Sequence, residues 1–223
     1  MARETFQTAL ADLRAAVLDM GELVVKRLKT ALAAFEADDE ETARRVLQTD
    51  DQVNQRYLEL ESRCIDLFAL EQPVASDLRL VAASFKIITD LERVGDLAAN
   101  LAQYTLSRTA ILPAVGIPEI GREAIDMLED ALVAYDDRVA EACRVVTSRD
   151  DDLDAKCEQA SSQLVRNLIE RDPIAATGNL ETLIEDVESV LLTIRDLERI
   201  GDHAVNVAGR TLYVLEGDPE LVY

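Results

Sequence analysis

The chain contains few residues that interrupt helices and few that build common catalytic sites. Its 223 residues include eight Gly, five Pro, one His and no Trp. Scarce helix breakers leave long uninterrupted stretches, which favours long helices. The single His limits the chain to one Ser/His/Asp triad at most, and no Gly-rich phosphate-binding loop is present. We therefore expect that the protein is not an enzyme.

Cysteines and long apolar runs are also scarce. Cys64, Cys143 and Cys157 are odd in number, far apart and without zinc-site spacing, so we predict three buried structural thiols. No run reaches about 18 apolar residues, and the N-terminal segment has no apolar signal core. These absences predict no membrane insertion and a cytoplasmic protein.

Positive charge is in deficit. The chain has 44 Asp and Glu against 23 Lys and Arg, a net charge of −21, which disfavours binding to nucleic acid or to anionic membranes. Lysine occurs only at positions 26, 29, 86 and 156. Such an acidic, lysine-poor surface is typical of proteins kept soluble in a salty cytoplasm. An acidic bias from a GC-rich genome is the alternative interpretation.

Apolar residues recur at three- and four-residue steps, as in Leu10, Leu13 and Val17, which indicates helices. Asp38 and Asp39 are candidate N-caps for the second helix. The pattern predicts an all-α fold of six long helices. They cover residues 4–36, 39–70, 75–108, 119–136, 138–171 and 179–215.

The sequence contains an internal repeat. Residues 31–54 align with residues 131–154 at a constant offset of 100. Residues 90–100 align with residues 196–206 at an offset of 106, with eight identities in eleven positions. We therefore predict two tandem, antiparallel three-helix bundles related by a pseudo-twofold axis. A connection rich in Pro and Gly places the boundary so that the halves are residues 1–112 and 113–223.

Each half carries the same acidic helix motif, with carboxylates and an amide spaced i, i+4 and i+8. Like charges at i, i+4 destabilise a helix by roughly 0.2–0.5 kcal/mol, and a mid-helix Gly costs about 1 kcal/mol relative to Ala. Both halves keep these costs, which indicates that the motif is used. We expect the Gly to allow a neighbouring helix to approach closely. The motif residues are Glu92, Gly95, Asp96 and Asn100 in one half, and Glu198, Gly201, Asp202 and Asn206 in the other.

Carboxylate and amide oxygens at this spacing suit hard or borderline cations such as iron, manganese, magnesium or calcium. The alternative is a solvated acidic face in which Arg93 and Arg199 pair with Asp96 and Asp202. A lone His such as His203 is more often a helix residue with its hydrogen bonds satisfied than a metal ligand.

Runs of aspartate also repeat, at 50–51 and 150–152, with Asn54 and Asp154 one turn further on. We interpret these runs as a local helix irregularity with solvated acids. The alternative is that they extend the acidic site from a facing helix.

The doubled D-L-E-R-[VI]-G-D motif, the stretch Q-P-V-A-S-D-L-R at 72–79 and the ending G-D-H-A-V-N-V-A at 201–208 resemble the PhoU family over essentially the whole chain. The resemblance implies a cytoplasmic, usually dimeric regulator that represses phosphate-starvation genes and limits phosphate uptake. It implies partners in the phosphate ABC transporter, including its ATPase subunit, and in many bacteria a sensor histidine kinase. The second half lacks the 72–79 stretch, so partner-facing surfaces are expected to differ between the halves.

The resemblance also implies metal clusters on the acidic motifs, iron most often, with manganese, magnesium, calcium or zinc as alternatives. Carried over, the metal residues are Glu92, Asp96, Asn100, Glu198, Asp202 and Asn206, with Asp90 and Asp196 as secondary candidates. Two other functions remain open: a metal-free structural or dimerisation bundle, and a di-metal carboxylate enzyme. The enzyme lacks support because such sites use Glu-x-x-His pairs, and Ile200 stands three residues before the only His. No basic cluster is present, so we predict that phosphate is sensed through partners rather than bound directly.

Overall fold

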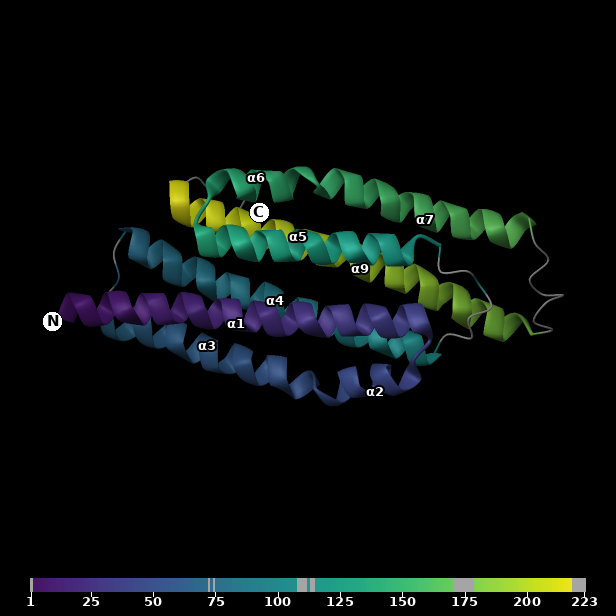
Figure 1. Cartoon of the computed structure of the whole chain (residues 1–223), viewed down its shortest axis with the longest axis horizontal. Helices are drawn as coiled ribbons and strands as arrows, with labels where there is room; N and C mark the ends of the chain where they lie inside the picture. Colours follow the sequence, from purple (N-terminus) through teal and green to yellow (C-terminus); the bar gives the residue numbers. More distant parts are fainter. Residues whose placement is uncertain are drawn as a thin grey trace.

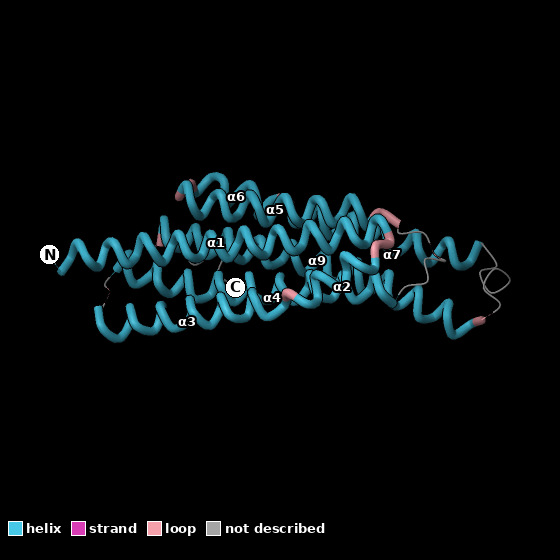
Figure 2. Tube along the Cα trace, turned by 60° about the horizontal axis from the view of Figure 1, so that its bottom comes forward, coloured by secondary structure: helices cyan, strands magenta, loops and turns pink. Residues whose placement is uncertain are grey.

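A computed structural model describes residues 2–71, 73, 75–107, 112, 115–170 and 179–217. Within these ranges the chain is almost entirely α-helical and contains no strand, which confirms the predicted all-α class (Figures 1 and 2). The helices of the first half are α1 (Ala2–Ala37), α2 (Glu40–Gln48), α3 (Asp50–Glu71) and α4 (Ala75–Ser107). Those of the second half are α5 (Ile117–Asp137), α6 (Ala140–Ser148), α7 (Asp150–Glu170) and α9 (Leu180–Glu216).

Two of the six predicted helices are interrupted. The segment predicted as 39–70 divides into α2 and α3 at Thr49, and the segment predicted as 138–171 divides into α6 and α7 at Arg149. The Thr49 hydroxyl donates a hydrogen bond of 3.0 Å to the Val46 carbonyl, a local bond that competes with the regular helix pattern. At the start of α2, Asp39 accepts a 3.0 Å hydrogen bond from the Thr42 N–H, which confirms it as an N-cap.

The two halves are three-helix bundles that lie side by side. The α2–α3 arm and the α6–α7 arm lie on opposite outer sides, while the long helices lie between them (Figure 1). The halves meet where α4 packs against α9 and α1 packs against α5. This arrangement confirms the predicted tandem bundles.

Reciprocal contacts at the α1–α5 junction show the pseudo-twofold relation. A Cβ added to Gly21 would lie 2.6 Å from a methyl carbon of Leu132, and one added to Gly121 would lie 2.7 Å from a methyl carbon of Leu32. The two pairs are the same contact seen from each half, since the residue numbers differ by 100. Glycine at each position leaves room for a leucine side chain from the other half.

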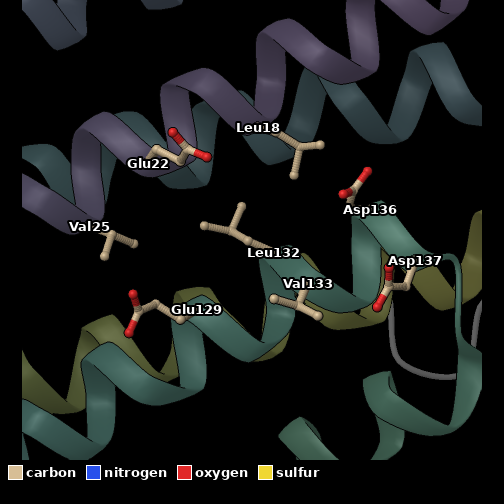
Figure 3. Close-up of a pocket in the computed structure, with 8 residues that line it drawn as sticks. All are labelled: Leu18, Glu22, Val25, Glu129, Leu132, Val133, Asp136 and Asp137. Atoms are coloured by element: carbon tan, nitrogen blue, oxygen red, sulfur yellow. The ribbon is translucent and has the colours of Figure 1, made fainter.

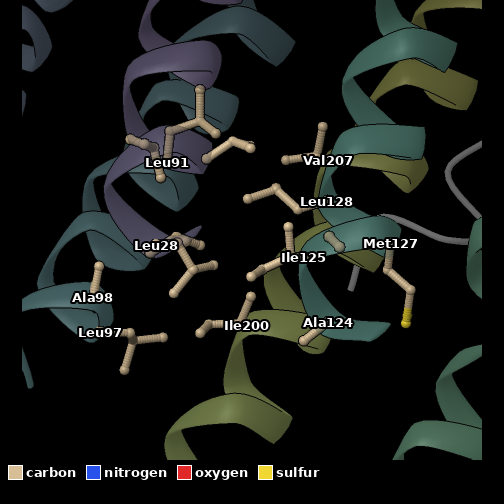
Figure 4. Close-up of a cluster of buried hydrophobic side chains, with 14 of the residues drawn as sticks. Leu28, Leu91, Leu97, Ala98, Ala124, Ile125, Met127, Leu128, Ile200 and Val207 are labelled. Carbon is tan, nitrogen blue, oxygen red and sulfur yellow. The ribbon is translucent and has the colours of Figure 1, made fainter. Parts of the chain in front are cut away.

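One continuous apolar core runs through both halves. Figure 4 shows Leu28 from α1, Leu91 from α4, Leu128 from α5 and Ile200 from α9 in the same cluster. The two bundles therefore bury apolar surface against each other as well as within themselves.

Buried polar groups are few, and the three cysteines are all buried and unpaired. Burial raises the pKa of the Cys64 thiol to about 12, so this sulfur is an apolar packing group at neutral pH. The prediction of structural thiols is confirmed. Across the described ranges, no helix combines the length and apolar character needed to cross a bilayer.

Candidate functional site: an acidic group and an interface network

Four carboxylates gather where α7 packs against α9. Asp150 and Asp154 project from the first turns of α7, and Glu198 and Asp202 from the middle of α9; we call these four residues the acidic group. The carboxylates on α7 and those on α9 repel one another, which contributes to the raised pKa values of Asp150 and Glu198. The group is possible because Gly201 has no side chain, and Leu153 of α7 fills the space that a Cβ would occupy.

The acidic group carries more negative charge than its surroundings can compensate. Burial, followed by the charges of Asp154 and Asp202, raises the pKa of Asp150 to about 6. Burial and the neighbouring carboxylates also raise the pKa of Asp154 and that of Glu198. Among the described residues, no hydrogen-bond partner reaches the buried Asp150 Oδ1. A cation placed here would offset the repulsion and give this oxygen a partner.

The first half repeats this arrangement with fewer charges. Glu92 and Asp96 occupy on α4 the places of Glu198 and Asp202, and a Cβ at Gly95 would lie 2.9 Å from Cγ1 of Val53 on α3. The expected role of the glycines in close helix approach is thus confirmed in both halves. Asn54, however, stands where the second half has Asp154, so the first-half site is less negative.

The structure places Asp90 in a different environment, at the α4–α9 interface between the halves. Asp90 is 3% exposed and forms an ion pair with Arg210 of α9. Its Oδ1 lies 2.9 Å from Nδ1 of His203. A longer hydrogen bond of 3.5 Å comes from the Asn206 side-chain amide. Burial lowers the pKa of His203 to about 4, so the ring is neutral at pH 7 and donates its Nδ1–H to the aspartate.

Asp196 occupies the pseudo-symmetric position on α9. Its Oδ2 accepts 2.9 Å hydrogen bonds from the Asn100 amide and from the Tyr104 hydroxyl, both on α4. Arg195 and Arg199 lie 3.5 and 3.6 Å from its Oδ1. Together, the contacts of Asp90 and Asp196 form what we call the interface network, which links α4 to α9 on both sides of the pseudo-twofold axis.

The predicted metal residues therefore divide between two places. Steps of four residues advance about 40° around a helix, so the third residue of an i, i+4, i+8 series is rotated by about 80° from the first. Glu198 and Asp202 face α7, whereas Asn206 bonds across the interface to Asp90. We predicted that the two asparagines, with Asp90 and Asp196, bind metal. This stays a prediction, and the interface contacts of these residues do not support it.

In the described ranges, no three His, Cys, Asp or Glu side chains have the geometry of a formed metal site. The nearby Cys157 thiol is protonated, since burial and then Glu198 raise its pKa to about 12. Binding of a cation by the acidic group would require its carboxylates to rotate inward.

The structure corrects the interpretation of one aspartate. We interpreted the aspartate runs as solvated acids at a helix irregularity. The irregularity is present at Arg149, but Asp150 is half-buried and faces α9, so that interpretation is wrong for Asp150. The signal that favoured the alternative was the repeat itself, because it placed the same aspartates one turn before Asn54 and Asp154.

Comparison with known proteins agrees with the arrangement of two repeats. The model of the PhoU domain matches residues 17–105 and again residues 117–211. The chain belongs to the PhoU family. A relative from Pseudomonas aeruginosa, named as a phosphate-specific transport system accessory protein PhoU homolog, is 34% identical over 218 residues, covering 96% of this chain and 86% of the relative. The PhoU accessory protein of Escherichia coli K12 is 32% identical over 220 residues, covering 95% and 86%.

PhoU crystal structures share the whole fold. The phosphate transport system regulatory protein PhoU from Streptococcus pneumoniae superposes with a TM-score of 0.86 at 28% identity, covering 96% of this chain and 98% of that protein. PhoU from P. aeruginosa gives a TM-score of 0.85 at 32% identity, covering 96% and 100%. The similarity therefore extends over both repeats, the α7–α9 contact and the α4–α9 interface.

Proposed function

We propose that this PhoU-family protein is a non-enzymatic accessory regulator of a phosphate ABC transporter. In this proposal it limits phosphate uptake and represses the phosphate-starvation response by binding partner proteins, the transporter ATPase subunit first and a sensor histidine kinase where the host has one. It acts in the cytoplasm as a homodimer. The observation that supports this most is the family match over nearly the whole chain to proteins named as phosphate-transport accessory proteins.

The side chains of the described part give catalysis little support. His203 is buried, neutral and engaged with Asp90, so it is not placed to transfer a proton to a substrate. The cysteine thiols are buried and protonated, as the raised pKa of Cys157 illustrates. What the molecule offers instead is a long helical surface for binding other proteins.

The regulatory proposal is tested in the host. A strain lacking this protein should take up phosphate and express phosphate-starvation genes at high external phosphate, and the wild-type gene should restore repression. Uptake of labelled phosphate and a starvation-promoter reporter are the measurements. Unchanged uptake and expression in the deletion strain would contradict the proposal.

We further propose that the acidic group binds a metal ion, iron first, with manganese, magnesium, calcium or zinc as alternatives. Asp150, Asp154, Glu198 and Asp202 would supply oxygen ligands, which suit hard and borderline cations. The buried Asp150 Oδ1 without a hydrogen bond and the raised pKa values of its neighbours support this. The ion would supply positive charge that holds α7 and α9 together, and Glu92 with Asp96 would form a second, weaker site.

Elemental analysis and calorimetric titration with Fe²⁺ and Mn²⁺ test the metal proposal. Combined Glu198→Gln and Asp202→Asn substitutions should abolish binding in the second half, while Glu92→Gln with Asp96→Asn should remove only the weaker site. Asp152→Asn is the matched control because that residue lies in the same turn of α7 and is exposed. If wild-type protein binds neither ion after reconstitution, and also binds no Mg²⁺, Ca²⁺ or Zn²⁺ in the same titration, the acidic group is a metal-free surface and the protein acts as a helical docking bundle.

Direct phosphate binding is not part of this proposal. The acidic group has the wrong charge for an anion unless a cation occupies it first. Phosphate titrated into metal-free protein should therefore give no heat of binding. Tight binding under these conditions would show that the protein senses phosphate itself.

A further inference from the structure

A groove runs along the junction between the two halves, where α1 and α5 lie side by side (Figure 3). Its volume is about 380 Å³. Its floor is apolar, with Leu18 and Val25 from α1 and Leu132 and Val133 from α5. Val133 is 55% exposed, so apolar surface is available in the groove.

Four carboxylates surround this floor: Glu22, Glu129, Asp136 and Asp137. Two of them are compensated, since Lys29 lies 2.6 Å from Glu129 and Arg14 lies 3.3 Å from Asp136. Within the described part of the chain, no hydrogen bond or ion pair engages the carboxylates of Glu22 and Asp137. The groove thus joins apolar surface to two uncompensated negative charges.

The pseudo-twofold axis provides an internal comparison. A second groove on the same junction is lined largely by the residues that the offset of 100 relates to the first. There, Arg122 stands in the place of Glu22, and Lys29 in the place of Glu129. The Lys29–Glu129 ion pair separates the two grooves. The remaining charged residues of the second groove are Glu36 and Asp126.

The repeat has thus kept the shape of this junction while its charge has changed. The first groove holds four acids, whereas the second holds two acids and two bases. Arg122 of the second groove is itself paired with Glu36 at 2.6 Å. A positively charged ligand would therefore distinguish the two ends of an otherwise pseudo-symmetric surface.

We propose that the α1–α5 groove with the four carboxylates is a docking site for a basic amphipathic helix of a protein partner. An apolar side chain of that helix packs on Leu132 and Val133, and an Arg or Lys one turn away pairs with Glu22 or Asp137. Amphipathic helices commonly bind in this way, with apolar anchors in a groove and charges at its rim. This inference rests on one part of the proposed function, namely that the protein acts by binding partner proteins.

Charge selects this occupant over a second copy of the chain. A second copy placed on this groove across a twofold axis would bring the four carboxylates of one copy towards those of the other, so we expect the homodimer to use a less acidic surface. A basic helix is attracted by the negative charge of the groove. The groove also joins α1 of one half to α5 of the other, so its occupant contacts both repeats at once.

A synthetic peptide tests the proposal without any transporter component. The probe is a fluorescent helix of about five turns with a Leu stripe flanked by Arg, and its match has Glu in place of Arg. Binding to the full-length protein is measured by fluorescence anisotropy at two salt concentrations. The test variant is Glu22→Gln with Asp137→Asn, and the control is Glu36→Gln with Asp126→Asn in the second groove. Both variants remove two negative charges, so general attraction to an acidic protein falls equally.

We expect the test variant to weaken binding of the Arg peptide at least tenfold more than the control, and the Glu peptide not to bind. In methyl NMR spectra, the largest shifts on adding the Arg peptide should come from Val25, Leu132 and Val133. Equal weakening by both variants, or shifts spread over the acidic surface, would overturn the proposal.

A second variant, Val133→Ser, separates a partner site from a self-interface. It should weaken peptide binding and leave the molecular mass from light scattering unchanged. If it instead dissociates a dimer, the groove is an interface between copies and the proposal fails. Because the deletion-strain test of regulation does not depend on this groove, the two proposals can fail independently.

Discussion

Two titratable side chains, Asp150 and His203, lie in surroundings that disfavour their charged forms, with opposite effects on stability. The pKa of Asp150 is raised to about 6 by burial and by its acidic neighbours. The pKa of His203 is lowered to about 4, chiefly by burial. Between about pH 4 and 6, folding therefore takes up a proton at Asp150 and releases a proton from His203.

Replacing Asp150 by Asn should expose this balance in metal-free protein. The raised pKa means that Asp150 destabilises the fold above pH 6, so Asp150→Asn should stabilise it by about 1 kcal/mol at pH 7, a value reduced for solvent screening. His203 favours folding at neutral pH and loses that contribution as pH falls from 6.5 towards 4. Without the opposing effect of Asp150, the variant should lose stability more steeply over that range. Urea denaturation in EDTA from pH 4 to 7 measures this.

The control for this experiment is Asp152→Asn, which changes an exposed carboxylate in the same turn of α7. Its unfolding free energy should follow that of the wild type at every pH. A variant at position 150 that is less stable than the wild type at pH 7 would show that the carboxylate is stabilising rather than repelled.

Asp90 is the residue on which the interface network most depends. Asp90→Ala would remove the carboxylate partner of the half-buried Arg210, leaving it the 3.0 Å hydrogen bond to the Lys86 carbonyl, and it would also remove the acceptor of His203. Breaking a buried pair in this way costs about 3–5 kcal/mol. Thermal or urea denaturation should show this loss, whereas Asp66→Ala, an exposed acid on α3, should change stability by less than about 0.5 kcal/mol. A loss no larger than that of the control would show that the network contributes little.

At the scale of helices, close approach explains why glycine persists in the middle of α4 and α9. Gly95 receives Val53 of α3, and Gly201 receives Leu153 of α7. The sequence predicted this role because a mid-helix glycine is unfavourable alone and both halves contain one. The identity of the residue that fills the space depends on tertiary packing, which the motif does not specify.

A double-mutant cycle measures this contact. Gly95→Ala should cost about 1–3 kcal/mol despite the better helix propensity of Ala, because the new Cβ would meet the Val53 side chain. Val53→Ala should lose apolar burial but make room, so the double variant should be more stable than the sum of the single changes predicts. Additive losses in urea denaturation would show that the two residues do not share a contact.

The helices themselves followed closely from apolar periodicity and the internal repeat, but two features did not. The aspartate runs predicted an irregularity beside Thr49 and Arg149, but not that a helix ends at each position, since neither carries Pro or Gly and apolar spacing continues across it. The motif carboxylates and asparagines were assigned to one stripe, although the rotation of about 80° along the series turns Asn100 towards Asp196. The second failure comes from packing between helices, which periodicity within one helix does not contain, whereas the break at Thr49 carries a local side-chain hydrogen bond.

At the scale of the whole molecule, the two repeats form one cooperative unit. Their apolar core is continuous, and the Ser84 and Tyr135 hydroxyls, one from each half, lie 2.9 Å apart within it. Two sequence repeats here do not amount to two independent hydrophobic cores.

Separate expression of residues 1–112 and 113–223 tests this cooperativity. Each half alone would expose the apolar faces of α4 and α1, or of α9 and α5, to water. We expect both fragments to aggregate or to lack a cooperative thermal transition, while calorimetry of the full chain shows a single transition. Two folded fragments whose melting temperatures match two transitions in the full chain would contradict this.

The ion pair between Lys29 and Glu129 has a consequence for the origin of the fold. The pseudo-twofold axis maps position 29 onto position 129, so the two residues of this ion pair are symmetry equivalents of each other. In a dimer of identical single repeats, the same two positions would carry the same residue, and a lysine would oppose a lysine or a glutamate a glutamate. Joining the repeats in one chain removed that constraint. Gene fusion therefore made available an attractive contact, and an unequal distribution of charge, that no symmetric ancestor could have had at this junction.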